Sequence, residues 1–190
     1  YSETAIGSLL FHARRIFGFR YKLLFTDGLG LEPALNQSLF ERQDYFQAIT
    51  LPHYHRLIQA GGDPKKIIFL PYGVDAKCYA RKQDKGAVRA RHGIPQDKTV
   101  ILSVAALNRR HKRIDYLIQE VSRLGKDYFL LVIGEPEEPD LIALGREVLG
   151  ERFKTLYVPF QQVAAFYHAA DLFVFPCLIG EFGLALAEAM

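Results

Sequence analysis

A cluster of basic residues has the chemistry of an anion-binding site. It follows the apolar run at 100–104, precedes a segment of helical period, and consists of Arg109, Arg110, Lys112 and Arg113. Cations beside the amide groups of a helix N-terminus bind anions, most simply a diphosphate. Taken alone, such a cluster is more often a solvated basic loop, so it needs a second, independent signal.

A second loop, after the apolar run at 172–176, offers complementary chemistry. Gly183 would let a ligand approach the backbone closely at the start of a helix. Glu188 lies within that helix, where a carboxylate can accept hydrogen bonds from two ribose hydroxyls. The competing interpretations are an exposed helical charge for Glu188 and, for Glu181, an acidic residue favoured by the helix dipole.

Together the two loops indicate a nucleotide ligand. A diphosphate requires cations and amides, whereas a ribose or a hexose requires carboxylates, and a nucleoside-diphosphate sugar requires both. The residue pattern by itself predicts only that the chain binds a phosphorylated nucleotide.

Short apolar runs alternate with segments of helical period, which predicts an α/β fold with a doubly wound parallel sheet. In such sheets ligands bind beyond the carboxyl ends of the strands. Three helices are expected around Ile114–Leu124 (ended by Gly125), Leu141–Val148 and Val163–Ala170. The predicted strands are Lys22–Phe25, Ala48–Leu51, Ile67–Leu70, Val100–Val104, Phe129–Ile133, Thr155–Val158 and Leu172–Phe175.

The stretch from Pro71 to Lys98 interrupts this alternation with glycines, prolines and charges. It predicts a crossing between two domains, with a short helix near Gly86–His92 and a second sheet starting at Thr99. Four strands and four helices fit after Thr99, but only three strands fit before Pro71. We therefore expect the chain to be a fragment, cut at both ends.

Composition supports a globular protein and gives little else. Hydrophobic residues make up 49% of the 190 residues and charged residues 24%, and the net charge is +3. The remaining Lys and Arg residues are scattered, so no nucleic-acid partner is expected. Cys78 and Cys177 lack paired metal spacing, no histidine has spacing typical of a metal site, and reduced thiols suit a cytoplasmic protein.

Several motifs, in this order, resemble retaining glycosyltransferases of the GT-B architecture, specifically glycosyltransferase family 4 (glycosyl transferases group 1). The resemblance implies two Rossmann-like domains: residues 1–72, the C-terminal part of an acceptor-side domain, and residues 73–190, a truncated domain that binds the donor nucleotide sugar. It is carried by the segments Ile67–Asp75, Ala169–Pro176, Phe182–Leu184 and Glu188–Met190.

The resemblance assigns roles to individual residues. Lys112 is similar to the lysine that contacts the donor diphosphate, and Glu188 to the second glutamate of a paired motif, which holds the ribose. The amides around Gly183 and Leu184 would meet the phosphates. The full set of implied donor-binding residues is Lys112, Arg109, Arg110, Glu181, Phe182, Gly183, Leu184 and Glu188. The resemblance implies no metal and no cofactor.

Two departures from the family pattern concern the donor. Gly180 stands where the family's first glutamate would be, with Glu181 one residue later. Ala106 stands where the family often has an arginine, a place that Arg109 or Arg110 could fill. Asp27, at the end of a predicted strand, would face the catalytic cleft, although a turn role is more common for such a residue; the catalytic residues themselves are not identified.

The predicted function is transfer of a sugar, with retention of configuration, from a nucleoside-diphosphate sugar to a glycan, lipid or small-molecule acceptor. The isolated fragment is expected to be inactive. The alternatives are a non-catalytic nucleotide-binding or interaction domain of the same fold, and an epimerase or phosphorylase of GT-B architecture. The expected location is cytoplasmic, and peripheral association with the inner face of a membrane is left open.

Overall fold

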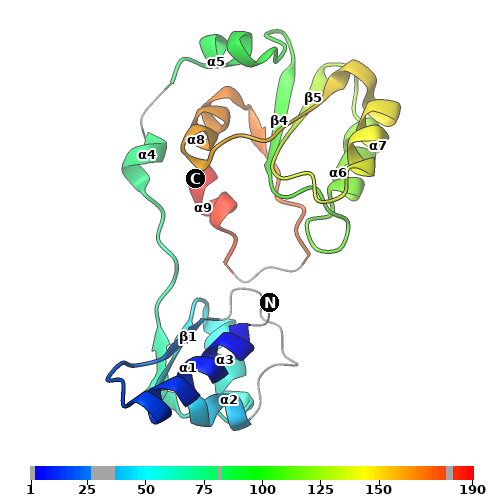
Figure 1. Cartoon of the computed structure of the whole chain (residues 1–190). Coiled ribbons are helices and arrows are strands. Elements are labelled where there is room, and N and C mark those ends of the chain that lie inside the picture. Colours follow the sequence, from blue (N-terminus) through cyan, green and yellow to red (C-terminus); the bar gives the residue numbers. More distant parts are fainter. Residues whose placement is uncertain (1–2, 27–36, 81–82, 179–181) are drawn as a thin grey trace. The chain divides into compact units, whose positions relative to one another are not determined.

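The computed structural model describes residues 3–26, 37–80, 83–178 and 182–190. The chain divides into two compact units, the first running to Gly73 and the second beginning at Val74 (Figure 1). In the described ranges, no helix combines the length and the apolar character that crossing a membrane requires.

The first unit contains a parallel three-stranded sheet in the order β1-β2-β3. Phe25 pairs with Phe46, which pairs with Ile67, and all three side chains are buried with Phe40 and Leu57 in one cluster. The elements are α1 (Glu3–Phe17), β1 (Leu24–Thr26), α2 (Gln37–Arg42), β2 (Tyr45–Ala48), α3 (Leu51–Gln59), the 3-10 helix η2 (Pro64–Lys66) and β3 (Ile67–Phe69).

The second strand and the first helix differ from expectation. The predicted strand at 48–51 is wrong for most of its length, because β2 ends at Ala48 and Thr50 caps α3. The Thr50 side chain accepts a hydrogen bond from the His53 amide, and proline occupies the first turn, which is a strong helix start. Helix α1 was not predicted at all.

The crossing to the second unit contains α4 (Ala76–Ala80) and α5 (Lys85–His92). Helix α5 confirms the short helix expected near 86–92. The Asp84 side chain caps its first turn by accepting from the Ala87 amide, and Gly93 ends it in the left-handed conformation that glycine tolerates.

The second unit contains a parallel four-stranded sheet in the order β6-β5-β4-β7, which confirms the predicted α/β fold with parallel strands. It begins at Thr99, as predicted. The elements are β4 (Thr99–Val104), α6 (Ile114–Ser122), β5 (Tyr128–Ile133), α7 (Asp140–Leu149), the 3-10 helix η3 (Gly150–Arg152), β6 (Phe153–Leu156), α8 (Phe160–Ala169), β7 (Leu172–Phe173) and α9 (Leu184–Ala189).

Several boundaries in this unit need correction. Strand β7 ends at Phe173, two residues before the predicted end at Phe175. Strand β6 begins two residues before the predicted start at Thr155, since Phe153 belongs to the sheet and is buried. Helix α6 ends at Ser122, so Gly125 does not end it; the amide of Arg123 makes the last helical hydrogen bonds.

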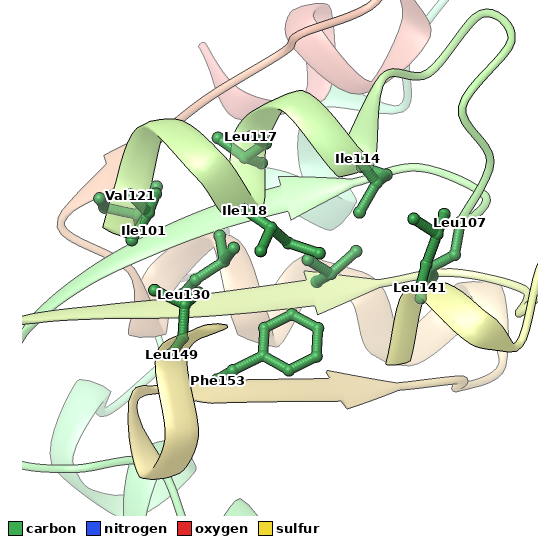
Figure 2. Close-up of a cluster of buried hydrophobic side chains, with 11 residues drawn as sticks. Ile101, Leu107, Ile114, Leu117, Ile118, Val121, Leu130, Leu141, Leu149 and Phe153 are labelled. Atoms are coloured by element: carbon green, nitrogen blue, oxygen red, sulfur yellow. The ribbon is translucent and has the colours of Figure 1, made fainter. Parts of the chain in front are cut away.

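Helices cover both faces of the second sheet. Leu107, Ile118, Leu130, Leu141 and Phe153 belong to the buried cluster between the sheet and helices α6 and α7, where their side chains point toward one another (Figure 2). A second cluster on the other face includes side chains of α8. Side chains enter both clusters from β4 and β5, which explains why these strands read as continuous apolar runs.

A polar network ties α5 to the second sheet. Arg89 is 3% exposed, and its guanidinium donates to the Asp171 carboxylate at 2.7 Å and to the carbonyls of Lys98 and Ala169. Asp171 also accepts from the Val100 amide at 2.7 Å and pairs with Lys85. The network lies at the start of β4, at the edge of the sheet opposite the carboxyl ends of the strands.

Candidate functional site

The basic loop at 105–113 is organised by a buried asparagine. Asn108 is 3% exposed, and its Oδ1 accepts from the amides of His111 at 3.3 Å and Lys112 at 3.0 Å. Its Nδ2 donates to Glu137 Oε2 at 2.6 Å. The basic loop therefore has a defined conformation, and the amide of Lys112 is held at its far end.

The basic loop also packs against the chain that follows β5. The Leu107 amide donates to the carbonyl of Glu135 at 2.8 Å, and the Glu138 amide donates back to the carbonyl of Leu107 at 3.0 Å. Between them, a Cβ atom at Gly134 would lie 2.0 Å from the carbonyl oxygen of Ala105. Only glycine allows this approach, because the obstacle is backbone that cannot rotate away.

Arg109 is engaged within the protein. Its guanidinium pairs with Glu138 at 2.5 Å and Asp140 at 2.6 Å. The Arg109 amide and then its guanidinium lower the pKa of Glu138, and the guanidinium lowers the pKa of Asp140. Arg109 thus holds the basic loop against the start of α7. Two carboxylates already partner its guanidinium, so Arg109 has a structural role whether or not a donor diphosphate is bound. Arg110, in contrast, is exposed to solvent.

The residue after Lys112 has an unusual backbone. Arg113 has φ +50°, the only positive φ at a non-glycine residue in the part of the chain that the structure describes, and it starts α6. A non-glycine residue in this region costs of the order of 1 kcal/mol or more, and such strain is concentrated at ligand sites. Its guanidinium stacks over the Tyr116 ring, 5.3 Å from the centroid, which holds the turn in place.

The basic loop meets the loop that follows β7. The Leu178 amide donates to the carbonyl of His111 at 2.9 Å, and Lys112 Nζ lies 4.0 Å from Cys177 Sγ. Because β4 and β7 are adjacent and parallel, both loops leave the carboxyl edge of the sheet. The expected convergence of the two loops is confirmed.

Gly183 begins α9 at the same edge. It has φ +67°, and an added Cβ would lie 3.5 Å from the Phe175 ring, just beyond β7. Among the described side chains none caps this helix start, and the amides of Leu186 and Ala187 both turn to the Gly183 carbonyl. Leu184 is exposed and Phe182 is partly buried. The predicted residues Glu181, Gly180 and Asp27 lie outside the described residues.

Glu188 lies on α9 and faces two tyrosines. Its Oε2 accepts from the Tyr167 hydroxyl at 2.9 Å, and the Tyr79 side chain lines the same pocket beside the carboxylate. Burial, and then the neighbouring Glu188 charge, raises the pKa of both tyrosines, so both remain neutral donors at neutral pH. Glu188 and the two tyrosines, with His168, line a pocket of about 360 Å³.

The predicted residues thus form two groups. Lys112 and Gly183 lie on the loops that converge at the carboxyl edge, whereas Glu188 lies further along α9, against α4 and α8. Three residues that support these groups were missed: Asn108, Tyr79 and Tyr167. A signal existed for Asn108, since asparagine within a loop commonly caps nearby amides, and for Tyr167, whose hydroxyl sits on an otherwise apolar helical stripe. In the described ranges, no three His, Cys, Asp or Glu residues gather as a metal site would require.

Known structures share this fold. HepE of Anabaena in complex with UDP-glucose matches with a TM-score of 0.79 and 19% identity, over 98% of this chain and 55% of that one. Sucrose-phosphate synthase of Thermosynechococcus elongatus matches with a TM-score of 0.74 and 20% identity, over 96% and 51%. The fold therefore matches that of GT-B glycosyltransferases, and the chain spans about half the length of these structures.

Sequence comparison gives the family. The D-inositol 3-phosphate glycosyltransferase of Kineococcus radiotolerans is 30% identical over 169 residues, which cover 80% of this chain and 39% of that protein. The family model described as "Glycosyl transferases group 1" matches residues 84–190, a range that contains Lys112, Gly183 and Glu188. As this match takes in more than half of the sequence and both converging loops, the chain belongs to the glycosyl transferases group 1 family.

Proposed function

We propose that the whole protein is a retaining glycosyltransferase of family 4, which moves a hexosyl or related group from a nucleoside-diphosphate sugar to an acceptor. The single observation that carries the proposal is the convergence of the two loops. Lys112 Nζ lies beside Cys177, and the Leu178 amide donates to the carbonyl of His111, so cationic and amide donors gather beyond the strand ends. A diphosphate requires this combination.

The chemistry assigned to this edge is stabilisation of the leaving group. When the bond between the anomeric carbon and the diphosphate oxygen breaks, negative charge develops on the phosphate oxygens. The Lys112 ammonium group and the amides at Gly183 and Leu184 would stabilise that charge, which is where preorganised donors contribute most. Glu188 would accept the ribose hydroxyls and so hold the nucleoside end of the donor.

The proposal is tested by removing the lysine from the full-length protein. Lys112→Ala deletes a charge-assisted hydrogen bond worth roughly 1.5–3 kcal/mol, so affinity for a nucleoside diphosphate should fall by about 10- to 150-fold. Affinity for the bare nucleoside should barely change. Calorimetry on UDP, GDP and ADP beside their nucleosides measures both effects.

Lys126→Ala is the matched control, since Lys126 is an exposed lysine just before β5, at the opposite edge of the sheet. It should leave both affinities unchanged. If Lys112→Ala weakens the affinity for the nucleoside and for the nucleoside diphosphate equally, the lysine supports the basic loop instead of binding phosphate. Binding without sugar transfer to any acceptor would favour a non-catalytic nucleotide-binding domain.

The acceptor, whether glycan, lipid or small molecule, and a peripheral association with a membrane stay predictions. Membrane association is supported by α1, which exposes Ile16 and Phe17 beside the cationic Arg15. Cosedimentation of the full-length protein with anionic phospholipid vesicles, compared with neutral ones, measures it. If the protein cosediments with neither kind of vesicle, the predicted membrane association is wrong.

A further inference from the structure

The carboxylate of Glu188 faces tyrosines from two other helices. Tyr167, on α8, donates its hydroxyl to Glu188 Oε2 at 2.9 Å, and Tyr79, on α4, lines the same pocket beside that carboxylate. The two rings meet edge to face, with centroids 5.7 Å apart. The three residues form a cluster, here called the tyrosine clamp, whose members are far apart in the sequence.

The two tyrosines of the clamp are themselves fixed. The carbonyl oxygen of Tyr79 lies 2.9 Å from Nε2 of His168, which ties α4 to α8. The Tyr167 ring packs against Phe173 at 5.5 Å, and its hydroxyl also lies 3.1 Å from the carbonyl of Ala185 on α9. The Tyr167 ring is therefore held by packing on both sides, and the backbone of Tyr79 is anchored to α8.

The clamp leaves part of the carboxylate available. An ionised carboxylate offers about four acceptor positions, and the Tyr167 phenol occupies one of them. Glu188 is partly buried and lines the pocket of about 360 Å³ together with Tyr79, Tyr167 and His168. Its remaining acceptor positions are thus directed by the clamp instead of being free to rotate.

The chemical type of the partners matters as much as their geometry. Phenols are neutral donors, so they orient Glu188 without cancelling its charge. A lysine or arginine in their place would neutralise the carboxylate and weaken its hydrogen bonds to a ligand. Hydrogen bonds to an ionised acceptor are roughly twice as strong as neutral ones, so a carboxylate that is oriented but still charged suits recognition of neutral hydroxyls.

We propose that Tyr79 and Tyr167 are positioning residues that hold Glu188 in the orientation that accepts the ribose of the donor. The inference rests on the proposed function, because it requires that Glu188 binds the ribose. It adds two residues that touch no donor atom but set the affinity for the nucleoside part of the donor.

The test uses Tyr79→Phe, Tyr167→Phe and Glu188→Gln in the full-length protein, with each phenylalanine also combined with Glu188→Gln. The probes are whichever of UDP, GDP and ADP binds the wild type most tightly, and inorganic pyrophosphate, which lacks a ribose. Each phenylalanine variant should bind the nucleoside diphosphate about 2- to 10-fold more weakly, the effect of one neutral hydrogen bond. Its affinity for pyrophosphate should not change. In the Glu188→Gln background the same change should be less than about 2-fold.

Tyr128→Phe is the matched control, as Tyr128 is a partly buried tyrosine at the start of β5, at the other end of the strands. It should alter neither affinity. Thermal unfolding without ligand checks that each variant folds, and Tyr79→Phe carries the test if Tyr167→Phe does not fold.

Two results would overturn the inference. Equal loss of pyrophosphate and nucleoside diphosphate affinity would show that the tyrosines support the whole site. A full effect of Tyr→Phe in the Glu188→Gln background would show that they act without Glu188. A wild-type protein that binds none of the three diphosphates would instead overturn the proposed function itself.

Discussion

Two carboxylates of the second unit, Asp171 and Glu188, are both partly exposed and both accept side-chain hydrogen bonds, yet their surroundings differ. Asp171 receives the buried Arg89 guanidinium, the Lys85 ammonium and a backbone amide. Glu188 accepts from the neutral Tyr167 phenol and lines a pocket with a second phenol, that of Tyr79. The first charge is cancelled by its partners, whereas the second is oriented but kept. The charge of the donors, more than their number, therefore separates a structural carboxylate from one that remains available to a ligand.

The largest effect is expected when the cancelled charge is removed. Asp171→Asn leaves Arg89 buried without its carboxylate, and breaking a buried pair in this way costs about 3 kcal/mol of unfolding free energy. Nucleotide affinity should not change. Urea denaturation and calorimetry measure the two quantities, and Asp127→Asn, at an exposed position beside the same strand ends, is the control. A loss of nucleotide affinity in a folded Asp171→Asn variant would break the comparison.

Low pH should remove the stabilising contribution of Asp171. Partial burial by itself would raise the pKa of Asp171, but hydrogen bonds from Lys85, the Val100 amide and Arg89 outweigh burial and lower that pKa to about 2. A carboxyl group whose pKa is lowered by folding stabilises the protein above its unfolded pKa, and that contribution disappears as the pH falls toward the folded value. Because Asp171 is partly exposed and solvent screens its ion pairs, the protein should lose about 1 kcal/mol through this group between about pH 4 and about pH 2.

The measurement is the unfolding free energy of the wild type and of Asp171→Asn across that pH range. Their difference should shrink as the pH falls, because the wild-type carboxyl group becomes protonated. A difference that stays constant down to about pH 2 would mean that the charge of Asp171 does not stabilise the fold.

The opposite behaviour is expected of Glu188. Glu188→Gln keeps the shape of the side chain and its capacity to accept from phenols, so the unfolding free energy should change by less than about 1 kcal/mol. Affinity for a nucleoside should fall by about 3- to 10-fold, because the ribose hydroxyls lose an ionised acceptor. Calorimetry with uridine, guanosine and adenosine, beside thermal unfolding, tests both. A strongly destabilised variant with unchanged affinity would place Glu188 in the same class as Asp171.

The smallest effect concerns Lys85, the exposed partner of Asp171. Its side chain is 46% exposed, and surface ion pairs contribute little. Lys85→Ala should therefore change the unfolding free energy by about 0.5 kcal/mol or less, measured by urea denaturation. A loss as large as that of Asp171→Asn would show that Lys85, not Arg89, is the main partner.

The sequence predicted the second unit better than the first. Buried parallel strands such as β4 and β5 are continuous apolar runs, so their positions are visible without any knowledge of the fold. Helix α1 was missed and β2 was displaced, because Ile49 and Thr50 look like strand residues until the Thr50 cap and the proline after it are weighed. Local capping decided that boundary against β propensity.

The sequence predicted the parts of the candidate site that follow directly from strand order. It could not predict the contacts that depend on how helices pack against one another. Lys112 and Gly183 follow strands of one sheet, so their convergence is a consequence of parallel topology. Tyr79 could not be linked to Glu188 in the same way, because their contact depends on how α4 packs against α9. Arg109 was included in the predicted donor site, and its pairing with Glu138 and Asp140, which follow another strand, could not be seen in the sequence.

The close approach of Gly134 to the backbone of Ala105 limits how this site could be transferred to another protein. Since a single methyl group there would collide with the carbonyl of Ala105, the basic loop and the chain after β5 are one module assembled from two stretches of sequence. Grafting 105–113 alone onto another scaffold would leave Asn108 and Arg109 without Glu137 and Glu138. The portable unit is the pair of loops with the glycine between them, and a library that randomises one loop must keep the other fixed.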